Sequence, residues 1–262
     1  MTSGTPEQPS RRARLRAETI SEIKASARRQ ILEVGPNGVS LRAIARELGM
    51  SPAALYRYFS SIEELIAQLC VDIHNELHDD AMREREKYAE DDHVGRLIAP
   101  VVALRRWAVL HPAEFALIFA SRISPATCKI RPPEDYTPIQ VQAYEASIRF
   151  ASLFGIEITR YFKQQQAAGK AIEASVPLPP RSEALKGEIR EGNAVIGAEI
   201  PDDEGYLFLN FWVRIYGLVA MEVFGHLPVE ANLDEFYWTE LHTMAGQLGV
   251  ELPRAEALNM TT

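Results

Sequence analysis

Residues 40–59, SLRAIARELGMSPAALYRYF, decide the fold of the N-terminal part of the chain. Apolar residues at three- and four-residue spacings predict a first helix that begins after Ser40 and ends at Gly49. Ser51 is placed to cap a second helix, with Pro52 in the first helical position, where its missing N–H costs nothing. Two short helices joined by a glycine-containing turn form the helix-turn-helix arrangement, whose second helix can enter the major groove of DNA.

Charge is distributed unevenly along the chain. The 262 residues carry a formal net charge of −8, which argues against a protein that coats nucleic acid without sequence preference. Residues 1–58 nevertheless hold ten Lys and Arg against five Asp and Glu, whereas residues 59–262 hold 18 against 31. A basic head is therefore attached to an acidic body, and the head is the part suited to DNA.

The cysteine content and the hydropathy of the chain indicate the cellular compartment in which the protein is expected. Cys70 and Cys128 form no CxxC pair and no spacing typical of a zinc site, so we expect neither a disulfide framework nor a metal centre. The N-terminus is polar and basic without the apolar segment of a signal peptide, and charges interrupt the longest apolar runs. We expect a cytoplasmic protein that does not enter a membrane.

The whole chain is predicted to be all-α, because apolar residues recur at helical spacings and no run alternates as a strand does. Residues 1–17 are rich in Pro, Ser and Arg with little apolar surface, which predicts a flexible basic arm that either contacts DNA or stays solvated. Residues 18–62 are predicted to form a three-helix head with the helix-turn-helix. Residues 63–252 are predicted to form a helical-bundle body, followed by a polar tail, residues 253–262.

The connector between head and body is predicted from a capping box. Ser61 and Glu64 are spaced so that each satisfies backbone N–H groups at the start of a helix, which is expected to run from residue 61 toward Tyr88. Apolar periodicity predicts body helices at about residues 94–110, 140–166, 206–224 and 233–248, and another after Pro112. Clusters of prolines predict irregular segments at residues 122–138 and 173–203. The second of these segments is expected to hold at most a short helical insert near residues 182–190.

The stretch SLRAIARELGMSPAALYRYFSS (residues 40–61), with a supporting helix before it and the capped connector EELI (63–66) after it, resembles the tetracycline-repressor (TetR) family of bacterial transcription regulators. This resemblance is specific over residues 18–66. In the body, WVRIYGLVAMEVFGHLP (212–228) resembles the subgroup whose body is named for a Trp-His-Gly signature, with Tyr216 in place of the histidine.

The resemblance implies which side chains of the head meet DNA. Ser40 and Arg42 would touch the DNA backbone, and the second helix would face the groove. Its Tyr56 and Tyr58 are suited to phosphates, and its small residues allow close approach to a base or a thymine methyl group. Ile62 stands where many relatives have a phosphate-binding lysine, so that contact is expected to be absent unless arginines of the arm replace it. The expected DNA-binding residues are Ser40, Arg42, Ser51, Ala53, Ala54, Tyr56, Arg57 and Tyr58.

Aromatic side chains recur through the body, where their ordinary role is core packing. Beside polar groups such as Arg149, Asn210 and Arg214, the same residues could instead enclose an apolar pocket with a few orienting groups. The resemblance favours the pocket, for an unidentified small-molecule effector. The residues proposed to line it are Trp107, Phe115, Phe119, Phe150, Phe154, Glu157, Phe211, Trp212 and Tyr216.

These features indicate a ligand-responsive transcriptional repressor that acts as a homodimer. One short helix reads only a few base pairs, so specificity requires a second copy on a palindromic operator in double-stranded DNA. The resemblance places the dimer seam on the last two long helices, at about residues 206–224 and 233–248. The effector would favour a conformation, transmitted through the connector, in which the two heads no longer match successive major grooves.

Two alternatives remain at this level. The chain could be a helical small-molecule-binding protein or an enzyme whose helix-turn-helix is only structural. It could also be a metal-responsive regulator, because His74 and His78 lie four residues apart on one face of the connector. No nucleophile with a base, paired carboxylates, phosphate-binding glycine loop or metal cluster occurs at a supporting spacing, so we expect no catalytic residue and no cofactor.

Overall fold

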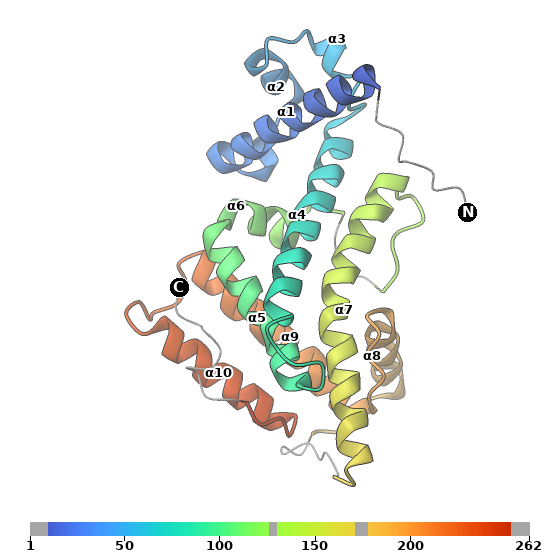
Figure 1. Cartoon of the computed structure of the whole chain (residues 1–262), viewed down its shortest axis with the longest axis vertical. Helices are drawn as coiled ribbons and strands as arrows, with labels where there is room; N and C mark the ends of the chain where they lie inside the picture. The colour runs from blue at the N-terminus through green and yellow to red at the C-terminus, as the bar shows by residue number, and fades with distance from the viewer. Residues whose placement is uncertain (1–9, 126–129, 171–177, 253–262) are drawn as a thin grey trace, which may run out of the picture.

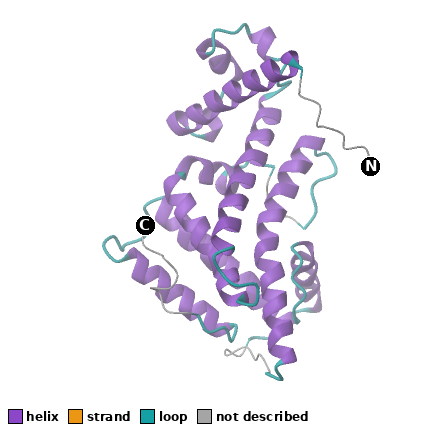
Figure 2. Cartoon of the chain, viewed as in Figure 1, coloured by secondary structure: helices purple, strands orange, loops and turns teal. Residues whose placement is uncertain are grey.

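The computed structural model describes residues 10–125, 130–170 and 178–252. These residues form helices and loops only (Figure 2). The head packs around a small core that includes Ile23, Ile44, Leu55 and Phe59, each fully buried. Its elements are α1 (Arg11–Val34), η1 (Pro36–Gly38), α2 (Leu41–Glu47) and α3 (Pro52–Leu55).

The described part of the predicted basic arm, residues 10–17, is helical rather than unfolded. The Ser10 hydroxyl accepts a hydrogen bond from the backbone N–H of Ala13 at 3.2 Å, so α1 begins at Arg11. Arginine, alanine and leucine are good helix formers, and they extend α1 beyond its first buried residue, Ile23. The periodicity of buried residues could not reveal this extension, because its side chains are exposed. The rest of the arm lies outside the described residues.

Helix α4 (Ile62–Arg85) connects head and body, as predicted, and runs between α5 (His93–Leu110) and α7 (Pro138–Ala167) (Figure 1). Its start differs from the predicted box in one detail. The Ser61 hydroxyl accepts a hydrogen bond from the Glu64 N–H at 3.2 Å, but the Glu64 carboxylate reaches back to the N–H of Ser60, at 2.7 Å, one residue before the cap.

Two ion pairs fasten α1 to α4. The Lys24 Nζ lies 2.8 Å from the Asp72 carboxylate, and one turn further along both helices the Arg28 guanidinium forms two hydrogen bonds with Glu76, at 2.6 and 3.0 Å. The head is therefore held to the connector by side chains as well as by the chain itself.

The remaining body helices agree with the predicted segments, except that the insert expected near residues 182–190 is a helix extending to Val195. The Ser182 hydroxyl caps this helix by accepting the N–H of Leu185 at 3.2 Å. Prolines around it favoured the interpretation as a loop. The elements are α6 (Pro112–Phe115), η2, a π-helical turn (Ala116–Ala120), α8 (Glu183–Val195), α9 (Asp202–Val223) and α10 (Leu233–Gln247).

A buried arginine fixes the arrangement of α5, α9 and α10. The Arg105 side chain, only 5% exposed, forms two 2.8 Å hydrogen bonds with Glu222 and one of 2.7 Å with Asp234. Its guanidinium also lies 4.6 Å above the centre of the Tyr237 ring. Three helices thus share one charge network in the core.

Helix α9 is long and apolar enough to cross a membrane by length and composition alone, with a mean hydropathy of 1.2 over 18 residues. Core helices pass the same test, and α9 packs against α5 and α8. Its outer face carries exposed apolar side chains at helical spacing: Val213 and Met221, with Phe224 at the C-cap. The body therefore leaves one apolar stripe uncovered.

Candidate nucleic-acid interface and effector cavity

The second helix of the helix-turn-helix is short and ends in tightened turns. Its Ser51 hydroxyl accepts the N–H of Ala54 at 3.2 Å, as the sequence predicts for a cap. Beyond Leu55, the N–H of Arg57 bonds to the carbonyl of Ala54 at 3.3 Å and that of Tyr58 to Leu55 at 2.8 Å. These i to i+3 bonds tighten the chain, so residues 56–58 continue the surface of α3.

Burial divides this segment into two faces. Leu55 and Phe59 are fully buried, while Ala53, Tyr56 and Arg57 are exposed, and Tyr56 keeps 48% of its surface accessible. Because the buried residues hold the segment on the head, the exposed side chains project from a fixed support. The exposed set among the predicted residues is Arg42, Ser51, Ala53, Tyr56 and Arg57, with Ser40, Ala54 and Tyr58 partly buried.

Two of the predicted residues have local roles that the sequence did not indicate. Tyr58 packs against the head core, and the Arg16 guanidinium lies 5.0 Å above the centre of its ring. Ser40 stands at the N-cap of α2, but its side chain forms no capping bond, and its backbone N–H donates to the Gln30 side chain at 3.1 Å. The contact between Arg16 and Tyr58 places the start of α1 next to residues 56–58, which follow α3.

The two parts of the head are joined by Glu47 at the end of α2. Its carboxylate accepts a 2.6 Å hydrogen bond from the Ser26 hydroxyl and a 3.0 Å bond from Arg29, both in α1. Both hydrogen bonds lower the pKa of Glu47, and the bond from Ser26 has the larger effect. The orientation of α2, and hence of the turn that follows, is set by α1.

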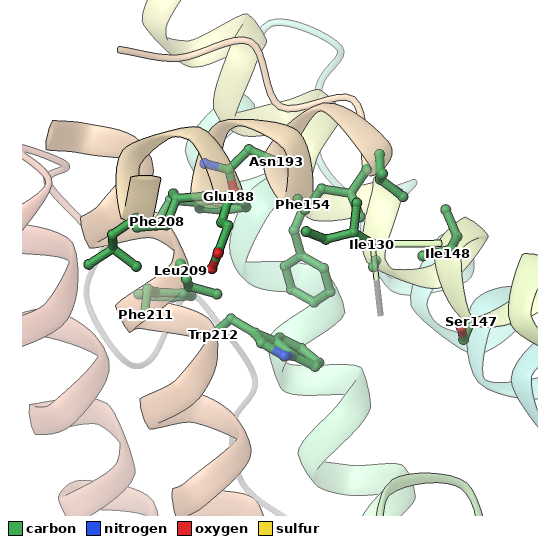
Figure 3. Close-up of a pocket in the computed structure, with 16 residues that line it drawn as sticks. Ile130, Ser147, Ile148, Phe154, Glu188, Asn193, Phe208, Leu209, Phe211 and Trp212 are labelled. Carbon is green, nitrogen blue, oxygen red and sulfur yellow. The ribbon is translucent and has the colours of Figure 1, made fainter. Parts of the chain in front are cut away.

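The body contains a cavity of about 340 Å³ between α7, α8 and α9. The rings of Phe154 and Trp212 face it, with centroids 5.6 Å apart (Figure 3). Most of its wall is apolar. The lining residues are Ile130, Ser147, Ile148, Ala151, Phe154, Leu185, Glu188, Ile189, Gly192, Asn193, Val195, Ile196, Phe208, Leu209, Phe211 and Trp212.

Three of the nine residues proposed for a pocket line this cavity: Phe154, Phe211 and Trp212. Three others form an aromatic cluster beside it, in which Phe119 lies 6.5 Å from Trp212 and 6.0 Å from Tyr216, and Phe115 lies 5.1 Å from Phe119, between ring centroids. The cavity is therefore connected by ring contacts to α6 and η2.

The other three proposed pocket residues lie elsewhere. Phe150 packs edge-on against Phe154, and Trp107 stacks on His111. The Glu157 carboxylate is fully buried among three arginines and a histidine, and it accepts hydrogen bonds from Arg85, His93, Arg96 and Arg160. Burial raises the pKa of this carboxyl, but the hydrogen bonds outweigh that effect, so the pKa lies below its usual value.

One wall of the cavity comes from α8, which the sequence predicted only as a short helical insert near residues 182–190. Leu185 and Ile189 are four residues apart and follow the Ser182 cap, so their spacing was the signal available for this wall. Glu188 and Asn193 lie on the same helix and also line the cavity.

The histidine pair considered for metal binding is not arranged as a metal site. His74 is buried, its Nδ1 lies 2.8 Å from the Cys70 carbonyl oxygen, and burial lowers its pKa to about 4. His78 lies near Asp79, and the described residues contain no group of three side chains suited to a metal. Burial raises the pKa of the Cys70 thiol to about 12, and Cys128 lies outside the described residues.

Comparison with known proteins gives concordant matches over both parts of the chain. The family model for bacterial regulatory proteins of the tetR family matches residues 23–69, and the model for the tetracyclin repressor-like C-terminal domain matches residues 97–244. The HTH-type transcriptional regulators Rv1816 of Mycobacterium tuberculosis and Mb1846 of Mycobacterium bovis are each 43% identical over 108 residues, 41% of this chain and 46% of theirs. The match spans about half the length of these curated relatives.

Solved structures share the fold over nearly the whole chain. SCO4313, described as a candidate regulatory protein, has a TM-score of 0.64 and 25% identity, with 92% of this chain and 100% of that chain covered. A protein of unknown function from Rhodococcus sp. RHA1 has a TM-score of 0.59 and 21% identity, with 94% and 100% covered. Together with the two family models, these likenesses show that the chain belongs to the TetR family of transcriptional regulators, with a helix-turn-helix head and an all-α body.

Proposed function

We propose that the chain is a homodimeric repressor that binds a palindromic operator through residues 51–58 of each copy and leaves it when a small molecule occupies the cavity between α7, α8 and α9. The carrying observation is the division of this segment into a buried face, Leu55 and Phe59, and an exposed face with Tyr56 and Arg57. A rigid, basic, solvent-facing turn is what a groove reader requires.

Each exposed side chain is assigned a contact by its chemistry. The Arg57 guanidinium presents a fork of donors suited to the O6 and N7 acceptors of guanine, and the Tyr56 hydroxyl suits a phosphate oxygen. Ser51 and Ala53 are small enough to let the segment approach the base edges. Arg42 in α2 is placed for the adjacent phosphate backbone.

The partner in the dimer is a second copy of the chain, packed through α9 and α10. The exposed apolar stripe of α9, from Val213 to Phe224, supports this assignment. Burial of such apolar surface between two copies stabilises the dimer by about 25 cal/mol for each Å² removed from water. Two copies are also required for specificity, because the recognition segments must reach grooves about 34–36 Å apart.

The effector acts by favouring one of two conformations of the dimer. Trp212 lines the cavity and contacts Phe119 in η2, and α6, immediately before η2, packs against α1 of the head. A ligand that displaces Trp212 thereby changes the support of the head. The boundary between head and body lies at the start of α4, near residue 62. The protein acts in the cytoplasm, where its operator lies.

The test begins with selection of a binding sequence from random double-stranded DNA by the full chain. The expected consensus is palindromic, and its affinity falls steeply as salt rises, because several phosphates are contacted. Failure to enrich any sequence at low salt would contradict operator binding and favour a helical binding protein with a structural helix-turn-helix.

A further inference from the structure

The cavity carries a single charge. Glu188 is the one ionisable side chain among the described residues that line it, and no lysine, arginine or histidine is among them. The carboxylates before and after it on α8 are paired: Glu183 with Lys186 at 2.8 Å, and Glu191 with Arg131. Glu188 has no hydrogen bond or ion pair within the part of the chain that the structure describes.

The Glu188 carboxylate shares its space with two aromatic rings. Figure 3 shows it directed into the cavity toward the side on which the rings of Phe154 and Trp212 lie. Those rings are tilted by 58° to one another with centroids 5.6 Å apart. Aromatic faces attract cations through their quadrupole, and a carboxylate attracts them by its charge. Both kinds of group in one cavity favour the same sign of ligand.

Apart from the indole N–H of Trp212, the neutral polar groups of the lining belong to Ser147 and Asn193, and both side chains are already bonded within the protein. The Ser147 hydroxyl donates to the carbonyl of Tyr144 at 2.6 Å, and the Asn193 amide donates to the carbonyl of Gly205 at 3.3 Å. An anion would meet a carboxylate without a compensating cation, and a strongly polar neutral ligand would lose hydrogen bonds to water against the apolar wall.

We propose that the cavity binds an apolar organic cation. Its aliphatic or aromatic body fills the apolar volume, and one amine or quaternary ammonium group lies against the rings of Phe154 and Trp212 within reach of Glu188. This inference rests on the proposed function, in which the cavity is the effector site, and names the chemical class of the effector. A volume of about 340 Å³ fits a single small ligand.

The experiment compares two probes of equal shape. 4-tert-Butylbenzyltrimethylammonium and its uncharged isostere, in which carbon replaces the nitrogen, are titrated into the full chain while tryptophan fluorescence is followed. Trp212→Phe identifies the signal that comes from the cavity. The cation is expected to bind about tenfold more tightly than the isostere, because both probes touch the rings but only the cation gains the ion pair and the cation–π attraction.

Substitution of the carboxylate isolates its contribution. Glu188 is exposed, and Glu188→Gln removes its charge while keeping its size, so the fold should not change. This variant is expected to reduce the preference for the cation to about threefold or less. Glu191→Gln is the matched control, since it removes a neighbouring α8 carboxylate that does not line the cavity. This control is expected to retain the tenfold preference.

The remaining outcomes separate the two proposals. Equal affinity of cation and isostere for the unsubstituted chain overturns the cationic effector and leaves an apolar effector cavity in place. A preference that survives in Glu188→Gln overturns the role of this carboxylate. Binding of neither probe overturns both the cationic effector and the effector cavity, whereas operator binding stands or falls by the selection experiment alone.

Discussion

The hydroxyl of Tyr216 in α9 donates a hydrogen bond to the backbone carbonyl oxygen of Phe119 at 3.0 Å. Phe119 lies in η2, where the helix widens to a π-helical turn, a rare geometry that is frequent at functional sites. The bond joins the helix with the apolar stripe to the segment that follows α6.

Tyr216→Phe is predicted to lower the free energy of unfolding by about 1 kcal/mol, because the carbonyl of Phe119 loses its donor while the ring contacts remain. Urea unfolding followed by circular dichroism measures the difference. The same variant is expected to weaken the release of operator by effector, since the link between α9 and η2 is loosened. Unchanged stability and unchanged release would show that the bond has no such role.

Arg57→Ala is predicted to weaken binding to the selected operator by about 1–3 kcal/mol and to relax the preference at the base pair that Arg57 reads. Fluorescence anisotropy with the operator and its single-base variants measures both effects. Arg83→Ala, which removes an exposed arginine of α4, is the control and should leave affinity unchanged. Equal affinities for Arg57→Ala and the unsubstituted chain would remove this residue from the interface.

Tyr56→Phe is predicted to weaken operator and unrelated DNA by a similar factor, because a hydroxyl on a phosphate carries no sequence information. The loss is expected to be about 0.5–1.5 kcal/mol, the usual net contribution of one hydrogen bond. Anisotropy titrations on both DNAs at one salt concentration provide the comparison. A loss confined to the operator would assign Tyr56 to a base instead.

Arg105→Met is predicted to destabilise the body by about 3–5 kcal/mol, because it leaves the largely buried carboxylate of Glu222 without its partner. The loss is measured as the decrease in the free energy of unfolding. Arg83→Met breaks an exposed pair with Asp80 and should cost no more than about 1 kcal/mol. Similar losses in the two variants would mean that burial of the Arg105 network adds nothing.

Acid is predicted to destabilise the protein through His74. Its pKa is lowered from 6.5 to about 4 by burial, so the unfolded chain binds a proton in a pH range where the folded chain does not. The contribution of His74 to the free energy of unfolding is therefore fully present above pH 6.5 and is lost as the pH falls, with a loss of about 2 kcal/mol at pH 5. Urea unfolding at pH 7.5 and pH 5 should show a smaller acid loss for His74→Gln. An equal loss in both proteins would contradict the prediction.

The head was largely predictable from the sequence because its signals are local. The Ser51 cap and Pro52 start a helix, and the turn contains Gly49, whose φ of +64° is a backbone conformation that suits glycine. The buried pair of Leu55 and Phe59 also follows from spacing alone. In each case a few neighbouring residues determine the geometry.

The cavity could not be predicted in the same way, because it forms only where side chains of three separate helices, α7, α8 and α9, come together. Phe154 and Trp212 were named from aromatic character, but the same reasoning named Trp107, and Glu157 was named as a polar group beside the aromatic residues. The neighbours of Trp107 and Glu157 are decided by packing between helices. Glu188 was missed because one acidic residue in a short predicted helical insert gives no sign of the cavity that the insert borders. The helical start of α1 was missed because its exposed residues leave no periodicity.

The ion pairs of Lys24 with Asp72 and of Arg28 with Glu76 hold the head at one angle on α4. Because of them, the spacing of the operator half-sites and their base sequence are recognised by different parts of the protein. In the proposed dimer, the angle of each head on α4 determines how many base pairs separate the half-sites, whereas residues 51–58 determine their sequence. Substitutions at the ion pairs therefore change the accepted spacing without changing the bases that are read. Spacing and base preference can then evolve independently among related regulators.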